Sequence, residues 1–195
     1  MRTLRCWKWT SVKIALIALL VGLPQGFAAG DVMDSAANGF TVKISANIHA
    51  APADVFSHIM QVGQWWNPEH TYSGDAHNLS IEGHPGGCFC ERLGGQGSVR
   101  HMEVIFVAPG KVLRFTGGLG PLQSLAATGT LTFSLAAAED GTKLDVTYAV
   151  GGYFPQGMNT LAAPVNEVLT EQINRLKSYI ETGSPAAKES ETKPQ

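Results

Sequence analysis

A long amphipathic segment near the carboxyl end places the strongest constraint on the fold. Between Gly157 and Gly183, apolar residues recur at the three- and four-residue spacing of a helix, while polar residues occupy most positions between them. Gly183, Ser184 and Pro185 then follow, a combination that ends helices. Such a broad apolar face needs a large surface to cover it. The residues that form this face are Leu161, Val165, Val168, Leu169, Ile173, Leu176 and Ile180.

Short segments with alternating apolar and polar residues would supply that surface. They are typical of half-buried strands, and a glycine-rich turn at 94–97 joins two of them. Two short helices are expected at 52–60 and 62–66, after the first strand. This order predicts an α+β fold, in which a curved antiparallel sheet grips the long helix around a cavity. The expected strands cover 40–48, 88–93, 98–107, 111–116, 130–135 and 144–150.

The amino-terminal residues have the pattern of a secretory signal peptide. Four basic residues precede or flank the apolar run 14–23, and the small residues Gly26 and Ala28 follow it. An apolar run of about ten residues is half the length needed to span a bilayer. We therefore expect residues 1–28 to be removed, with no stable membrane insertion afterwards, and a periplasmic or secreted product. Residues 29–38 are expected to be a flexible linker, 39–183 one domain and 184–195 a disordered tail.

Removal of residues 1–28 would leave an acidic chain. The predicted signal holds four of the 14 Lys and Arg residues and none of the 16 Asp and Glu residues, so the remainder has a net charge of −6. An acidic surface repels the phosphate backbone, so no nucleic-acid partner is expected. No cofactor is expected either, because the glycines at 117–120 lack the strand–glycine–helix setting of a phosphate-binding loop. We interpret 117–123 as a flexible lid over the cavity.

Two cysteines remain after the predicted signal, Cys88 and Cys90. In an ideal strand their Cα atoms would lie about 6.6 Å apart with parallel side chains. That separation is near the upper limit for a disulfide. Free thiols are therefore expected, unless a bulge brings the two residues together.

Several local motifs resemble one known family. The segment 48–56, the adjacent Trp65 and Trp66, the turn at 85–87, and the segments 107–113 and 176–181 are similar to the activator-of-Hsp90-ATPase-homologue branch of the START-like, or Bet v 1-like (SRPBCC), superfamily. The resemblance covers 39–183 and implies a helix-grip fold. This superfamily includes lipid carriers, plant ligand binders, polyketide cyclases and co-chaperones, so the fold does not select one function. The namesake's role on a cytosolic chaperone is not transferred, because this chain carries an export signal.

Two registers compete for the hairpin formed by 88–93 and 98–107, and they differ by one residue. In the first, the side chains that face the cavity are Cys88, Cys90, His101 and Glu103. The second buries a more apolar set but turns two charges inward: Phe89, Met102, Val104 and Phe106, with Glu91 and Arg100. The apolar counts on the two faces are nearly even. We take the first register as the working hypothesis.

This register leads to a first functional hypothesis, the binding of a small hydrophobic or amphipathic molecule between the sheet and the long helix. His101 and Glu103 would be its polar anchor, and Gln172 would interrupt the apolar stripe of the helix. One of the two adjacent tryptophans is expected in the core and the other at an opening. The other expected lining residues are Trp65 or Trp66, Cys90, Phe115, Phe133, Tyr148, Val168 and Leu169.

Three alternatives remain open. His101, oriented by Glu103, could be the acid–base group of a cyclase, dehydratase or isomerase. Two thiolates, an imidazole and a carboxylate are also competent metal ligands, although two adjacent strands seldom bring four such groups together, and no metal is expected. The domain could instead modulate a protein partner in the cell envelope. Pro164 adds a structural alternative, because the helix either starts near Ala163 or is kinked there.

Overall fold

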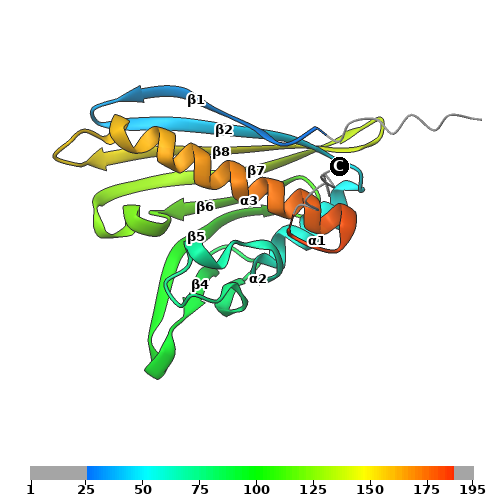
Figure 1. The fold of residues 1–195 in the computed structure, drawn as a ribbon, viewed down its shortest axis with the longest axis horizontal. Coiled ribbons are helices and arrows are strands. Elements are labelled where there is room, and N and C mark those ends of the chain that lie inside the picture. Colours follow the sequence, from blue (N-terminus) through cyan, green and yellow to red (C-terminus); the bar gives the residue numbers. More distant parts are fainter. Residues whose placement is uncertain (1–25, 187–195) are drawn as a thin grey trace, which may run out of the picture.

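The computed structural model describes residues 26–186 (Figure 1). Most of the predicted signal peptide and of the predicted tail therefore lies outside the described residues. The helices are α1 (Pro52–Met60), α2 (Val62–Trp65) and α3 (Ala162–Thr182). The strands are β1 (Ala29–Ala36), β2 (Gly39–Ile48), β3 (Leu79–Ile81), β4 (Cys88–Arg92), β5 (Ser98–Ala108), β6 (Val112–Gly117), β7 (Ala126–Ala138) and β8 (Gly141–Tyr153).

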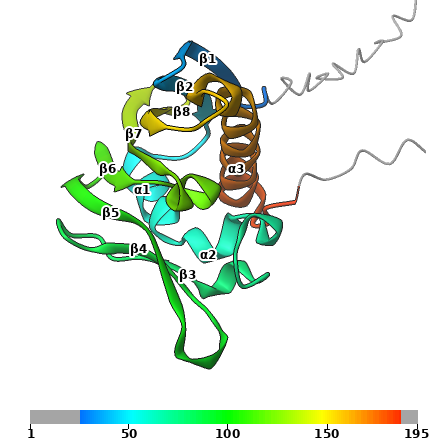
Figure 2. The ribbon, with the colours of Figure 1, turned by 90° about the vertical axis from the view of Figure 1, so that its left-hand side faces the viewer.

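Within the described range, the strands form one eight-stranded sheet in the order β1-β2-β8-β7-β6-β5-β4-β3. Every neighbouring pair is antiparallel. The sheet curves around α3, which lies across its inner face, while α1 and α2 lie near the carboxyl-terminal end of α3 (Figures 1 and 2). The predicted α+β helix-grip fold is confirmed.

The long helix begins and ends as its sequence suggests. α3 starts at Ala162, directly after a short 3-10 turn (Met158–Leu161). Pro164 lies in the first turn, where its missing N–H leaves no intrahelical hydrogen bond unmade, so the helix starts here and needs no kink. At the other end Gly183 adopts a left-handed conformation (φ 78°) and its N–H donates to the Tyr179 carbonyl at 2.9 Å.

The expected flexible linker at 29–38 is instead the strand β1 and a tight turn. β1 pairs with β2 from Ala29 opposite Ser45 to Ala36 opposite Gly39. It also contacts α3, because Asn166 Nδ2 donates to the Gly30 carbonyl at 3.2 Å. A Cβ at Gly30 would collide with the Thr170 hydroxyl, so glycine permits this close approach. The prediction is wrong because main-chain pairing, which needs no buried side chains, orders this mostly exposed segment.

No helix within residues 26–186 is both long and apolar enough to cross a membrane. The hydrophobic core lies between the inner face of the sheet and α3. Trp65 is buried there, and its indole N–H donates to the His58 carbonyl at 2.9 Å.

Candidate functional site

A β-bulge between β4 and β5 builds the centre of the site. Phe89 lies opposite Met102, but the next residue, Cys90, lies opposite Arg100, so His101 is an extra residue on β5. Because of the bulge, two successive residues of β5 face inward. His101 is 5% exposed and Met102 1%.

The working register is therefore wrong for β4 and for Glu103. Phe89 and Glu91 face the core and are 3% and 0% exposed, as in the second register. Glu103 lies on the outer face, where its carboxylate pairs with Arg100 at 3.1 Å. The second register is not followed throughout either. Arg100 stays outside, and a second irregularity between Val104 and Phe106 leaves Phe106 exposed.

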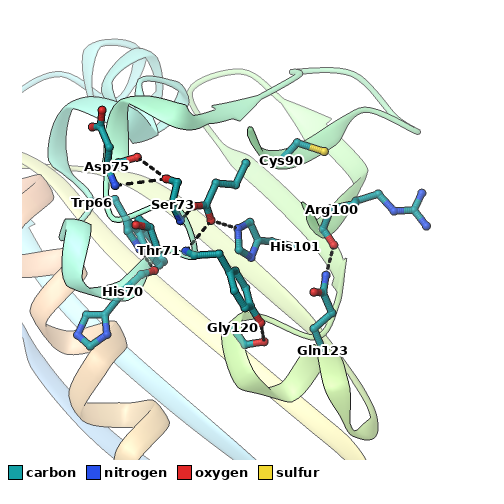
Figure 3. A network of polar contacts seen from close by, with 12 residues as sticks. Trp66, His70, Thr71, Ser73, Asp75, Cys90, Arg100, His101, Gly120 and Gln123 are labelled. Carbon is teal, nitrogen blue, oxygen red and sulfur yellow. Dashed lines mark hydrogen bonds and ion pairs between the residues drawn. The ribbon is translucent and has the colours of Figure 1, made fainter. Parts of the chain in front are cut away.

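The two cysteines form a disulfide, so the expectation of free thiols is wrong. Their Cα atoms are 5.3 Å apart instead of the spacing of an ideal strand. The pairing register shifts between Phe89 and Cys90, so β4 is not an ideal strand where the two cysteines lie. The Cys90 side chain points away from His101, on the outer side of the sheet (Figure 3). Among residues 26–186, no group of three or more His, Cys, Asp and Glu side chains is placed to hold a metal.

Glu91, not Glu103, is the acidic partner of His101. His101 Nε2 lies 2.9 Å from Glu91 Oε2, and both side chains are almost fully buried. The backbone N–H groups of Tyr72 and Ser73 donate to the same carboxylate. Figure 3 shows the His101 ring directed toward this loop, which includes Thr71 and Ser73.

These hydrogen bonds determine the charge of Glu91. Burial on its own would raise the pKa of the Glu91 carboxyl group, but the hydrogen bonds from Ser73, Tyr72 and His101 outweigh burial and lower the pKa. Glu91 is therefore a carboxylate at neutral pH. A carboxylate only accepts, so Nε2 of His101 carries the proton of this hydrogen bond. The other ring nitrogen, Nδ1, is buried and has no hydrogen-bond partner among the described residues.

His101 forms part of the wall of a cavity of about 360 Å³ between the sheet and α3. The other walls are Trp66, residues 69–72, the loop residues 119–122 with Leu125, side chains from the sheet, and five residues around the start of α3: Leu161, Pro164, Val165, Val168 and Leu169. Most of this lining is apolar.

Five of the predicted lining residues contact the cavity: Trp66, His101, Tyr148, Val168 and Leu169. Trp66 and Trp65 divide as expected, one at the cavity and one in the core. Six predicted residues do not line the cavity. Trp65, Phe115 and Phe133 are core residues, Cys90 and Glu103 lie on the outer face, and Gln172 is buried elsewhere. Gln172 Oε1 accepts a hydrogen bond from the Asn67 N–H at 2.8 Å, so this amide joins α3 to the end of α2.

The loop predicted as a lid does line the cavity, and Tyr148 holds it in place. The Tyr148 hydroxyl donates to the Gly117 carbonyl and accepts from the Leu119 N–H, each at 3.0 Å. Burial raises the pKa of Tyr148 to about 12, although the hydrogen bond from Leu119 opposes this shift. The Tyr72 hydroxyl donates to the Gly120 carbonyl at 3.1 Å from the other side of the opening.

The sequence analysis missed Glu91 and Tyr72 as site residues. The second register does turn Glu91 inward, so the alternation of the sequence indicates this residue, but only in the register that we did not adopt as the working hypothesis. Tyr72 follows a short 3-10 turn (Pro68–His70) in a polar loop, and its ring stacks on that of His101 with centroids 5.8 Å apart. Nothing in the local pattern of that loop indicates this contact.

Solved structures share the fold at low sequence identity. A protein from Rhizobium leguminosarum matches with a TM-score of 0.55 and 16% identity, over 80% of this chain and 99% of that one. A conserved protein of unknown function from Enterococcus faecalis matches with a TM-score of 0.55 and 17% identity, over 84% of this chain and 81% of that one. CalU16 from Micromonospora echinospora matches with a TM-score of 0.53 and 16% identity, over 82% of this chain and 85% of that one. No curated protein matches this chain significantly.

The family assignment rests on the sequence. Residues 39–181 match the model of the family described as polyketide cyclase / dehydrase and lipid transport. This stretch is most of the chain and covers β2 to α3. The narrower assignment to the activator-of-Hsp90-ATPase-homologue branch stays a prediction. The chain belongs to the polyketide cyclase, dehydrase and lipid-transport family, within the START-like, or Bet v 1-like, superfamily.

Proposed function

We propose that this protein binds a small, largely apolar molecule in the cavity between the sheet and α3, with the polar group of the ligand at His101. The single observation that carries the proposal is an apolar cavity of about 360 Å³ whose wall includes a buried, partly unsatisfied histidine. Ligand sites of roughly 300–1,000 Å³ commonly combine apolar walls with a few fixed polar groups. The family, which includes lipid-transport proteins, supports the same reading.

The Glu91–His101 pair supports a second candidate function, acid–base catalysis on the bound molecule. The carboxylate orients the imidazole, and the unpaired Nδ1 could take a proton from a ligand. Such a pair suits a cyclase, dehydratase or isomerase. In this alternative Glu91 replaces Glu103 as the residue that positions His101.

We also propose that the protein acts in the periplasm or outside the cell. The pattern of residues 1–28 supports this location. The Cys88–Cys90 disulfide supports it as well, because disulfides persist in oxidising compartments. Modulation of an envelope protein stays a hypothesis without a specific contact in its favour.

Native mass spectrometry after mild purification tests the binding proposal. We expect a bound small molecule, or uptake of fatty-acid or aromatic probes. A Val168→Phe variant should reduce uptake, because Val168 lines the cavity and the larger ring would fill it. The control Glu103→Gln changes the outer face and should bind normally. A domain that is repeatedly empty and takes up no probe contradicts the proposal.

The variant His101→Ala separates the two candidate functions. Once a ligand is identified, loss of turnover with retained binding indicates catalysis. Equal loss of turnover and binding indicates a plain binding protein.

A further inference from the structure

The donors and acceptors of the cavity wall define the ligand more narrowly than its apolar character does. Glu91 accepts three N–H hydrogen bonds, from Tyr72, Ser73 and His101. The hydrogen bond from His101 keeps the proton on Nε2, so in the neutral ring Nδ1 has a lone pair and acts only as an acceptor. Nδ1 is the ring nitrogen left without a partner.

The wall's own hydroxyl and indole donors are already engaged with backbone carbonyls. Tyr148 donates to Gly117 and Tyr72 donates to Gly120. Thr71 Oγ1 donates to the Pro68 carbonyl at 2.7 Å, and the Trp66 indole N–H donates to the His70 carbonyl at 3.1 Å.

The one other imidazole in the described wall is also engaged. His70 Nε2 lies 3.2 Å from Glu171 Oε2. Glu69, the carboxylate of the wall, adds a further acceptor. The hydroxyl and indole donors of the side chains that line the cavity are therefore engaged elsewhere, and His101 Nδ1 and the Glu69 carboxylate are left as acceptors.

We propose that the cavity selects apolar molecules that bear a hydroxyl group, an alcohol, phenol or enol, and that this hydroxyl donates its hydrogen bond to His101 Nδ1. The inference rests on the proposed function, because it concerns the ligand of the same cavity. It excludes carboxylates and simple ethers as preferred ligands.

The physical reason is the penalty for unpaired polar atoms in a buried site. A hydroxyl satisfies Nδ1 and is itself satisfied. An ether oxygen or a carboxylate brings a second acceptor, so Nδ1 stays unpaired and the ligand oxygen loses its water. A hydrogen bond of this kind corresponds to about a tenfold difference in affinity. A ligand carboxylate loses more affinity than an ether does, because the buried negative charge of Glu91 lies on the other side of the imidazole and repels it.

Three probes that share one ring system test this selectivity: naphthol, methoxynaphthalene and naphthoate, each substituted at the same position. Their dissociation constants are measured by isothermal titration with the purified protein. We expect naphthol to bind about tenfold more tightly than its methyl ether. The ether is the more apolar of the two, so hydrophobic burial alone would give the opposite order.

Two variants and one spectroscopic measurement complete the test. His101→Phe keeps a planar ring but has no acceptor, so naphthol and its ether should bind it equally. Glu103→Gln, on the outer face, should keep the wild-type preference. Nitrogen chemical shifts from NMR of the wild-type protein should show that His101 is protonated at Nε2 and unprotonated at Nδ1. This measurement does not depend on whether the His101→Phe variant folds.

Each other outcome overturns the inference in a distinct way. Equal affinities for the three probes in wild type overturn the selectivity and leave the binding function standing. A preference for naphthoate, or a proton on Nδ1, shows that His101 donates, and a preference for the ether shows that apolar burial alone sets the affinity; each result overturns the inference directly. Failure of all three probes to bind, together with an empty protein in native mass spectrometry, overturns the proposed function as well.

Discussion

Replacing Glu91 by glutamine should destabilise the protein, because this carboxylate organises the cavity wall. The side chain is 0% exposed and accepts hydrogen bonds from two backbone N–H groups and from His101. Glutamine has nearly the same shape but only one accepting oxygen. At least one of the three donors would then face an amide NH₂ group and lose its partner. We expect a loss of about 2 kcal/mol at neutral pH, within the usual cost of an unsatisfied buried polar group.

The size of this loss should depend on pH. The pKa of Glu91 in the folded protein is lowered from its ordinary value of 4.5, so the folded state favours the charged form. The resulting stability is fully present above the unfolded-state pKa and disappears as the pH falls through the lower folded-state pKa. Glutamine does not titrate. The difference between wild type and Glu91→Gln should therefore be largest near neutral pH and should shrink below pH 4.5.

Urea unfolding followed by circular dichroism measures this difference, with Glu103→Gln as the matched control. Glu103 is 39% exposed and forms a surface pair with Arg100. Its replacement should change stability by less than about 1 kcal/mol. Equal effects of the two variants at neutral pH, or a Glu91→Gln difference that stays constant on acidification, would refute the reasoning.

Four further predictions concern the elements around the site. Tyr148→Phe should cost about 1–2 kcal/mol in urea unfolding and loosen the 117–125 loop, detected by faster amide hydrogen exchange; unchanged exchange would contradict this. In wild type, absorbance of the Tyr148 phenolate should appear only near pH 12, and not at lower pH. Gly129→Ala should lower the free energy of unfolding by about 1–3 kcal/mol, because the added Cβ would lie 2.6 Å from the Tyr148 ring and from a backbone oxygen. The control Gly94→Ala should leave stability unchanged, because its Cβ meets no atom within 4 Å. Replacing Cys88 and Cys90 together by serine should cost less than the roughly 2–4 kcal/mol typical of disulfides, because the bridge encloses one residue; a larger drop in melting temperature than for Gly129→Ala would contradict this.

The helix-grip fold could be predicted because its signals are periodic and local. The apolar stripe of α3, the alternation in β2, β7 and β8, and the proline at the start of α1 each follow from the sequence within one element. β1 could not be predicted in this way. Its side chains are mostly exposed, and its order comes from main-chain pairing with β2 and from contacts of Gly30 and Ala28 with α3.

The site was only partly predictable, for a different reason. Trp66, Tyr148, Val168 and Leu169 lie on the apolar faces of regular elements or beside them, so the patterns indicated them. Gln172 is also buried, but its amide is engaged by the Asn67 backbone, a contact between residues about one hundred positions apart. Sequence periodicity describes which face is buried. It does not describe which distant backbone group a buried polar side chain meets.

The nearly even apolar content of the two faces of β5 follows from its two irregularities. In a regular strand, turning His101 inward would also turn Glu103 inward and expose Met102, so a polar anchor would replace part of the core. The bulge at His101 removes this conflict, because His101 and Met102 are buried side by side while Glu103 pairs with Arg100 outside. Glu91 lies on the inner face of β4 in the same arrangement and supplies the carboxylate that Glu103 was expected to supply. A single extra residue in β5 thus places His101 in the cavity wall, and the packing of Phe89, Met102 and Val104 is kept.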